Sequence, residues 1–538
     1  MTENGSGEGG AGAPDRAADW APELEELAQR RRMAAAMGGA ESVERQHAQG
    51  RLTVRERIDA LVDQGSFREV GQIAGKGRYE NGRLRSLTPA SYVAGLAAID
   101  GRPVAVGGED FTVRGGSSAG GVRRKGGQGG FSEDLALHLK MPLVNLCEGA
   151  GGTVTSTRDR GYTNLPGAIG NLKTCVQLLG MVPVVSAVLG STAGGPAIRA
   201  VLSHWSVMVQ GTSQLFAAGP ALVERSLGHS VEKESLGGPA VAVEAGGAIH
   251  DVVPDESAAL AMIRQFLSYM PRNVWEAPPS TTPTDPPARR EEALAAIIPK
   301  NRRHPYDMRR LVRLVVDKDS VMELQRTYGK AVITALARMN GRVVGIIASN
   351  PLANAGALDH KAARKQTSFL ELCNTFHIPI VFFVDVPGMM IGRDAEMAGT
   401  LREGARAIAA KHRATVPMIT VIVRKCYGMA GGIAVDDESL KLRVAWPSAE
   451  WGSLPLEGGV LTGYRSEIAA ASDPKARERE LEDELRALSS PFRTAEVFAV
   501  EDVIDPRETR PYLCRFLDVA AEAVRTQLGP KTHHAYNL

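Results

Sequence analysis

The chain has 538 residues, of which 43% are hydrophobic and 23% charged, with 63 lysines and arginines against 61 acidic residues. At about 100–200 residues per domain, this length predicts two to four domains, and the composition excludes a fibrous or largely disordered protein. The net charge of +2 gives no electrostatic case for nucleic acid or an anionic membrane as the main partner.

The N-terminal residues predict a short tail followed by helices. Residues 1–20 are rich in glycine and alanine and lack the apolar core of a signal peptide, so we expect a flexible tail. Apolar residues then recur at helical spacing over residues 21–63. The longest apolar runs, such as residues 181–189, are far shorter than the ~20 residues that span a bilayer, so no membrane segment is expected.

The middle of the chain predicts a domain boundary. Five prolines between Pro278 and Pro287 are incompatible with a helix or a central strand, so we expect an interdomain linker over residues 273–308. This linker separates an N-terminal domain, residues 21–272, from a C-terminal domain, residues 309–538.

The two domains look like copies of one another. Four β-rich apolar runs that end near glycine occur in the same order in both halves, which predicts a duplicated domain. The anchoring pairs are Gly101 and Gly341, Pro142 and Pro379, Gly194 and Gly431, and Asp251 and Asp502. Within each copy, short buried strands run into glycines and then into helical sequence. This rhythm predicts an α/β fold of repeated ββα units, with a ligand cleft between the two domains.

Glycine turns after two of these strands are candidate sites of chemistry. A glycine turn that leads into a helix presents backbone N–H groups to a negative charge, as in an oxyanion hole for the enolate of a thioester. The candidate donors are the amides of Ala150, Gly151 and Gly152 in the first copy and of Met429 and Ala430 in the second. The alternative is that both are tight turns that only pack a strand against a helix.

A second candidate is the glycine-rich loop over residues 115–130. It contains Arg123, Arg124 and Lys125, and a basic loop of this kind suits the phosphates of a nucleotide-like ligand such as the ADP end of coenzyme A. A solvated surface loop is the equally weighted alternative.

The sequence has few candidates for a catalytic side chain. Single histidines among apolar residues favour structural roles, and no HExxH or CxxC pattern predicts a metal site. Five scattered cysteines fit a reducing compartment, so we expect a cytoplasmic protein without disulfides. Glu148 and Asp385 follow buried strands at equivalent places and are either functional or caps of the next turn. Lys361 and Lys425 either face the cleft or lie exposed.

At this point the motifs are specific enough to indicate a family. The sequence resembles the carboxyltransferase (β) subunit of biotin-dependent acyl-CoA carboxylases, the group that contains the propionyl-CoA and 3-methylcrotonyl-CoA carboxylases. The matching passages are RLTVRERIDALVDQGSF (51–67), EDFTVRGGS (109–117), GSTAGGPA (190–197), GTSQLFAAGP (211–220), FVDVPGM with the ExxGxxRxGA pattern after it (383–405), and DVIDPRETR (502–510).

The resemblance implies a fold, a reaction and partners. The fold would be two duplicated crotonase-like (ββα superhelix) domains, assembled as a hexamer, homo- or mixed, with the active site between domains of different subunits. Carboxybiotin, on a separate carrier protein, would release CO₂, and biotin would take the α-proton of an acyl-CoA, so the protein itself needs no side-chain base. The chain has no MKM biotin-attachment motif and no ATP-grasp glycine loop, so a separate biotin carboxylase and biotin carrier are expected, with no metal in this chain.

The family's two oxyanion turns correspond to residues 148–153 and 427–431 here. The resemblance also implies substrate contacts from Gly194, Gly195, Gly428, Gly431, Gly432 and the basic residues of the glycine-rich loop. The first turn reads EGAGGT and lacks the serine and arginine of the family's DSGGAR pattern. Gly432 stands where propionyl-type enzymes have an acidic residue that shapes the acyl pocket, which predicts an acyl group larger than propionyl.

Three other functions stay open on the sequence. The same fold can run in reverse, as an acyl-CoA decarboxylase subunit that passes CO₂ to biotin. The altered first turn also fits a non-catalytic paralogue that assembles into a mixed hexamer. A biotin-independent crotonase-type enzyme would need a side-chain base, for which Glu148 is the one candidate.

Overall fold

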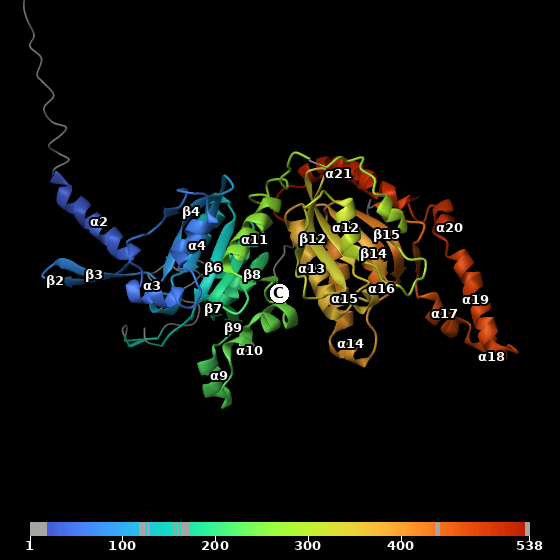
Figure 1. The fold of residues 1–538 in the computed structure, drawn as a ribbon, viewed down its shortest axis with the longest axis horizontal. Coiled ribbons are helices and arrows are strands. Elements are labelled where there is room, and N and C mark those ends of the chain that lie inside the picture. The colour runs from blue at the N-terminus through green and yellow to red at the C-terminus, as the bar shows by residue number, and fades with distance from the viewer. Residues whose placement is uncertain are drawn as a thin grey trace, which may run out of the picture.

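The chain forms two bodies that lie side by side (Figure 1), and each is built on an eight-stranded sheet. The computed structural model describes residues 19–117, 125, 130–154, 157–158, 161–163, 172–283, 285–435 and 442–532. The predicted tail spans residues 1–20, and its residues 1–18 therefore lie outside the described residues. The predicted loop residues Arg123 and Arg124 also lie outside them.

The first body contains a mixed sheet in the order β1-β4-β5-β6-β7-β8-β10, with β9 paired to β7. Its strands are β1 (Arg68–Glu69), β4 (Tyr92–Ile99), β5 (Arg102–Glu109), β6 (Leu143–Gly149), β7 (Val184–Ala193), β8 (Trp205–Val209), β9 (Gln214–Phe216) and β10 (Asp251–Val253). The pairs β1–β4 and β4–β5 are antiparallel and the others parallel. A separate hairpin, β2 (Gly75–Glu80) and β3 (Arg83–Pro89), extends from this body (Figure 1).

The second body repeats this arrangement, in the order β11-β12-β13-β14-β15-β16-β18 with β17 paired to β15. Its strands are β11 (Met322–Leu324), β12 (Val332–Met339), β13 (Arg342–Ser349), β14 (Ile380–Val386), β15 (Met418–Tyr427), β16 (Leu442–Ala445), β17 (Glu450–Gly452) and β18 (Asp502–Val503). Here too the first two pairs are antiparallel and the rest parallel.

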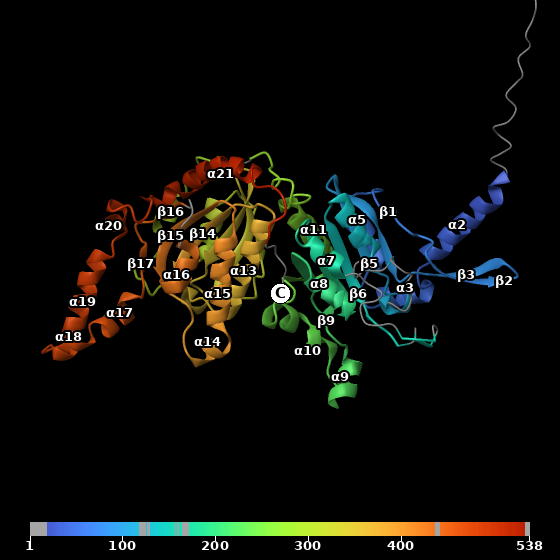
Figure 2. The same cartoon turned by 180° about the vertical axis from the view of Figure 1, so that it is seen from behind.

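Helices surround the two sheets, and several of them extend away from the sheets at the periphery of the molecule, as the front and back views show (Figures 1 and 2). Those of the first body are α2 (Ala21–Ala35), α3 (Ala40–His47), α4 (Val54–Leu61), α5 (Phe131–Leu139), α7 (Leu172–Leu178), α8 (Gly195–Val201), α9 (Pro220–Leu227), α10 (Lys233–Gly237) and α11 (Glu256–Tyr269). Those of the second are α12 (Met308–Val315), α13 (His360–Thr375), α14 (Arg393–Met397), α15 (Thr400–Arg413), α16 (Gly428–Val435), α17 (Leu456–Gly463), α18 (Arg465–Ala470), α19 (Pro474–Leu488), α20 (Pro491–Glu496) and α21 (Thr509–Arg525).

The helix predicted over residues 21–63 is confirmed as three helices with two breaks. Met37 and Gly39, with φ angles of 52° and 89°, lie in the break between α2 and α3, and their positive φ angles interrupt the helical conformation. A capping box of Thr53 and Glu56 starts α4 and satisfies backbone N–H groups that a helix start leaves unpaired. Val54, Ile58 and Leu61 of α4 are buried in the core, at the spacing of one helix face.

Strand registers confirm the duplication and correct one of its pairings. Leu143 pairs with Val184 in the first body, and Ile380 pairs with Met418 in the second. Counting along the ten-residue strands β7 and β15, Gly194 corresponds to Gly428. The sequence comparison had paired Gly194 with Gly431. That pairing is wrong because Gly428 already begins helix α16, so Gly431 lies inside its first turn.

The proline-rich segment expected to be a linker packs against the second body. Arg510 donates to the carbonyls of Asp285 and Pro286 at 2.8 and 2.9 Å, and Leu294 is buried in the second body's core. The two bodies share one hydrophobic cluster that includes residues of both. No helix among the described residues is long and apolar enough to cross a bilayer.

A buried histidine of the first body predicts a loss of stability in acid. Burial, with a smaller effect of His204, lowers the pKa of His250 to about 3, and its Nδ1 accepts the Ser206 N–H at 3.1 Å. In the unfolded chain the pKa is near 6.5, so below that pH the unfolded chain binds a proton that the folded chain does not. We expect stability to fall by up to about 1.4 kcal/mol per pH unit between about pH 6.5 and 3 from this residue.

Urea unfolding of wild type and His250→Asn between about pH 7 and 5 tests this expectation. Asparagine keeps an acceptor near Ser206 but does not titrate, so the variant should show a shallower decline. His412→Asn makes the same exchange at an exposed histidine and provides the comparison. Equal slopes for all three proteins would contradict the assignment.

Candidate functional site

Two equivalent strand–helix junctions lie at the carboxyl ends of β7 and β15. Gly194 and Gly428 have φ angles of 62° and 58°; α8 begins directly after Gly194, and α16 begins at Gly428. Backbone N–H groups in the first turn of a helix have no partner within the helix, and the helix dipole favours negative charge there. In open α/β sheets, ligands bind at this end of the strands. The sequence predictions placed Met429 and Ala430 at such a junction, and the structure does so.

The junction at α16 combines an exposed backbone with tight packing. Met429 is 61% exposed, whereas Ala430 and Gly431 are buried. A Cβ on Gly431 would lie 2.9 Å from Cys426, so only glycine fits there. A Cβ on Gly432 would meet no atom within 4 Å. Helix α16 therefore leaves open space beside Gly432, where a side chain could project.

The turn after β6 lies next to the other junction. A Cβ on Gly151 would be 2.7 Å from the Ala193 oxygen, and one on Gly194 would be 3.7 Å from the Gly151 Cα. Gly151 thus lies against the residues that lead into α8. However, the Ala150 N–H donates to the Gly115 oxygen at 2.9 Å. This contradicts the prediction that the Ala150 amide serves an oxyanion, because a backbone carbonyl already occupies it.

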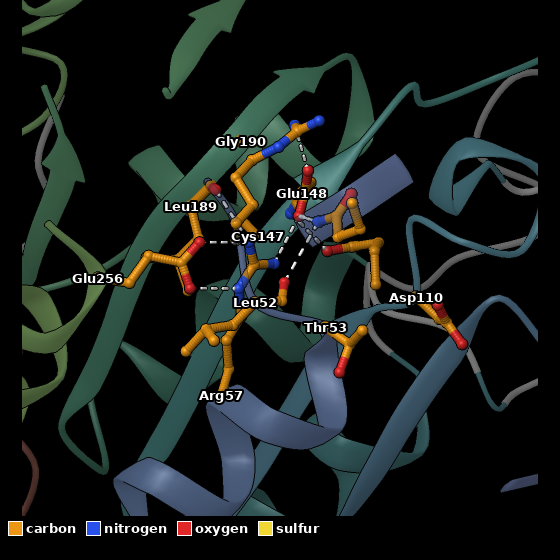
Figure 3. A network of polar contacts seen from close by, with 12 residues as sticks. Leu52, Thr53, Arg57, Asp110, Cys147, Glu148, Leu189, Gly190 and Glu256 are labelled. Carbon is orange, nitrogen blue, oxygen red and sulfur yellow. Dashed lines mark hydrogen bonds and ion pairs between the residues drawn. The ribbon is translucent and has the colours of Figure 1, made fainter. Parts of the chain in front are cut away.

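The carboxylate of Glu148, just before this turn, is buried among cations (Figure 3). Arg51 and Arg57 each contact it through Nη1 at 2.5 Å, and the Gln46 amide donates at 2.7 Å. Arg57 also pairs with Glu256 at 2.7 Å. A fully buried carboxylate held in this way is not placed to take a proton from a substrate. Glu148 is therefore neither a general base nor a cap of the next turn.

Asp385 holds the equivalent position in the second body. Its carboxylate accepts from the Arg424 Nη2 at 2.8 Å and Nε at 3.0 Å, and from the Lys425 N–H at 3.1 Å. Asp385 is 1% exposed. Glu148 and Asp385, the two acids that the sequence analysis identified, thus lie near the ends of central strands and are paired with buried arginines.

Two adjoining cavities, of about 350 and 430 Å³, open at the carboxyl ends of the second sheet. Both are lined by Arg302, Arg424 and Glu450. The first also has Arg303, Lys425, Pro387 and Tyr427 in its wall, so it adjoins the start of α16. Glu450 pairs with Arg302, and Arg424 with Asp385. Since cations outnumber acids in this wall, the cavity suits an anionic or strongly polar ligand.

Lys125 does not have the position expected of a phosphate ligand. Its ammonium donates to the Gly71 oxygen at 2.6 Å and contacts Glu69 at 3.2 Å, and burial lowers its pKa. This contradicts the predicted phosphate contact, because the charge is already paired within the first body. Among the described residues, no cluster of histidine, cysteine and acidic side chains is arranged to hold a metal ion.

Sequence reasoning missed the residues that surround Glu148. Arg51 and Arg57 lie in the family-like RLTVRERIDALVDQGSF passage, but their contact with a residue about ninety positions away is not a local pattern. One local signal existed. Gly190, in GSTAGGPA, is a glycine because a Cβ there would lie 2.3 Å from the Glu148 Oε1.

Comparison with known proteins identifies a matching family and similar sequences. The model of the carboxyl transferase domain matches residues 45–536. The propionyl-CoA carboxylase carboxyltransferase subunit of Haloferax mediterranei is 36% identical over 517 residues, which cover 94% of this chain and 98% of the relative. The methylmalonyl-CoA decarboxylase subunit alpha of Veillonella parvula is 34% identical over 500 residues, with 92% and 95% covered.

A solved structure supports the same conclusion for the fold. The crystal structure of transcarboxylase 12S, a hexamer with methylmalonyl-CoA bound, matches with a TM-score of 0.84 and 33% identity over 95% of this chain and 97% of that one. The two bodies are therefore duplicated crotonase-like domains. The chain belongs to the carboxyl transferase family, as a carboxyltransferase subunit of the type found in biotin-dependent acyl-CoA carboxylases.

Proposed function

We propose that the chain moves a carboxyl group between carboxybiotin, held on a separate carrier protein, and the α- or vinylogous γ-carbon of an acyl-CoA larger than propionyl. The observation that carries this proposal is the pair of equivalent strand–helix junctions, because each directs first-turn amides toward the carboxyl ends of the strands. One junction would stabilise the thioester enolate and the other the oxygen of the biotin ring.

Backbone groups of named residues would do this work. At the second junction the donors are the amides of Met429 and Ala430. At the first junction the donors are the amides of Gly151 and Gly152, together with those of Gly194 and Gly195. In the strand register, Gly194 and Gly195 correspond to Gly428 and Met429. Gly428 and Gly431 would keep the backbone close to the ligand, because one has a positive φ and the other has no room for a side chain.

The cavity beside α16 fits a small polar ring system. Its volume of about 350 Å³ is within the usual range of ligand sites, and Arg303 and Lys425 in its wall would attract a carboxylate. Carboxybiotin, when bound, supplies CO₂ and the base for the α-proton. The residues of this chain would orient the thioester, hold its developing negative charge and exclude water from the enolate.

The expected acyl preference gives a direct prediction at Gly432. Because a side chain there enters open space, Gly432→Asp should narrow the acyl pocket. We expect kcat/KM for a bulky acyl-CoA to fall by about 10–200-fold relative to propionyl-CoA. Gly463→Asp, at another glycine with open space around it, controls for the added charge. A wild-type preference for propionyl-CoA, or an unchanged preference in Gly432→Asp, would contradict the prediction.

The partners expected are further copies of this chain and a biotin-bearing protein. Exposed apolar side chains occur on the first body, at Leu222 and Leu227, and on the second, at Ile391, Met397 and Leu401. Apolar surface of this kind is typical of assembly, and the transcarboxylase 12S relative is a hexamer. We propose a hexamer here as well, working with a biotin carboxylase and a biotin carrier on separate chains.

The reverse reaction is the second candidate, because the Veillonella relative is named a decarboxylase subunit. Both directions need the same oxyanion holes. The test is carboxyl transfer from a panel of carboxyacyl-CoAs, from methylmalonyl-CoA to long-chain and 3-methylglutaconyl forms, to free biotin by the purified chain alone. Transfer supports the proposal and identifies the acyl class. A chain that binds acyl-CoA but transfers from no member would overturn it and favour the assembly paralogue.

A further inference from the structure

We infer that Glu148 is a positioning residue, whose buried carboxylate fixes the 149–152 turn against the start of α8 so that the turn's amides face the thioester. This inference rests on the proposed function. Glu148 is not expected to touch a reacting atom. It acts through the backbone that directly follows it.

The contacts of Glu148 tie the turn to two helices far away in the sequence. Its carboxylate contacts Gln46 of α3, Arg51 just before α4, and Arg57 of α4 (Figure 3). Its own N–H donates to Glu109 of β5 at 3.4 Å. The next residue, Gly149, pairs with Thr192 after an irregularity in the strand register. The residue is thus held from both its side chain and its backbone at the point where β6 becomes the turn.

The second body has the same device, built from different residues. Asp385 follows Ile380 by five positions, as Glu148 follows Leu143, and a register irregularity occurs there too. Its partner Arg424 occupies the β15 position that corresponds to Gly190 in β7. In the first body that position is a glycine, which leaves room for the Glu148 carboxylate, and the arginines come from the helices instead. We call a buried carboxylate that is paired with arginine where a central strand ends a charge clamp. Because both bodies have such a clamp, built from different residues, we infer that it is needed to hold the turn.

Stability alone does not account for this cluster. Burying ions costs desolvation energy that the attraction between them only partly offsets, and apolar replacements of similar volume are often as stable. What ion pairs with several hydrogen bonds provide is one defined geometry. That geometry is what an oxyanion hole requires, since a displacement of 1 Å can cost about 100-fold in rate.

The test compares two acids of one network. Glu148→Gln removes the carboxylate that precedes the turn, and Glu256→Gln removes the other carboxylate bound to Arg57, which lies on α11 away from the turn. Transfer to free biotin is measured with the best carboxyacyl-CoA of the panel, and rates are corrected for the folded fraction. We expect Glu148→Gln to lose about 100-fold in kcat with KM little changed, and Glu256→Gln to keep kcat within about threefold.

Two further variants keep the test decisive if Glu148→Gln does not fold. Glu148→Asp retains the charge and should recover part of kcat. Gly190→Ala leaves every charge in place but puts a methyl group where Glu148 Oε1 lies, so it should lower kcat with KM unchanged. Equal kcat losses in Glu148→Gln and Glu256→Gln, or a wild-type kcat in Gly190→Ala, would overturn the inference. Absence of transfer by the wild type would instead overturn the proposed function.

Discussion

Replacing Ala430 with proline is expected to lower kcat for carboxyl transfer by about 10²–10³-fold, the usual effect of removing one oxyanion donor. The change deletes one N–H group from the second junction and leaves all charged residues in place. Because that amide would act on charge that develops in the transition state, kcat and kcat/KM should fall together while KM for the acyl-CoA stays the same.

The equivalent junction of the first body already contains a proline. Twelve residues after Val184 comes Pro196, and twelve after the equivalent Met418 comes Ala430, so α8 already has proline at the corresponding place. Proline is accepted in the first turn of a helix because its missing N–H has no partner within the helix. Wild-type circular dichroism with wild-type kcat in Ala430→Pro would exclude the Ala430 amide as a donor.

The second large effect is expected from Arg57→Met, which should lower the free energy of unfolding by about 3–5 kcal/mol. Arg57 is 1% exposed and pairs with both Glu148 and Glu256, and its Nη2 also donates to the Leu189 oxygen at 3.0 Å. Methionine fills part of the volume but leaves two buried carboxylates short of a cation. Urea denaturation of wild type and variant measures the difference.

Arg264→Met is the matched control. Arg264 also pairs with two acids, Asp63 and Asp100, but its side chain is 29% exposed. Ion pairs near the surface contribute about 0–1 kcal/mol, so this variant should remain close to wild type. Similar losses of unfolding free energy in the two variants would show that burial does not determine how much the ion pairs of Arg57 contribute to stability.

The duplicated α/β fold could be predicted from the sequence because its signals are local. Apolar strands, glycines at their ends and helical spacing recur in one order in both halves, and the structure confirms three of the four anchoring pairs, Gly194 with Gly431 being the exception. That pair failed because several glycines occur close together around each junction, and only the strand register shows that Gly428 begins α16. Apolar spacing likewise predicted that residues 21–63 are helical, but not the two breaks that divide them into α2, α3 and α4.

Only those parts of the site that follow from a local sequence pattern could be predicted. The junction at Met429 and Ala430 follows from a strand, a glycine and a helix in sequence. The occupied amide of Ala150 depends on a carbonyl thirty-five residues earlier, at Gly115, and the pairing of Lys125 depends on Glu69 and Gly71. Such contacts between distant segments leave no periodic signal, which is why the Glu148 clamp was also missed.

The most direct test of the proposed function is the rate of carboxyl transfer from a carboxyacyl-CoA to free biotin, catalysed by the purified chain without its partners, for wild type and Ala430→Pro side by side. We expect measurable transfer by the wild type with at least one acyl group larger than propionyl, and a rate about 10²–10³-fold lower for the variant. Binding of acyl-CoA without any transfer, or equal rates for the two proteins, would contradict it.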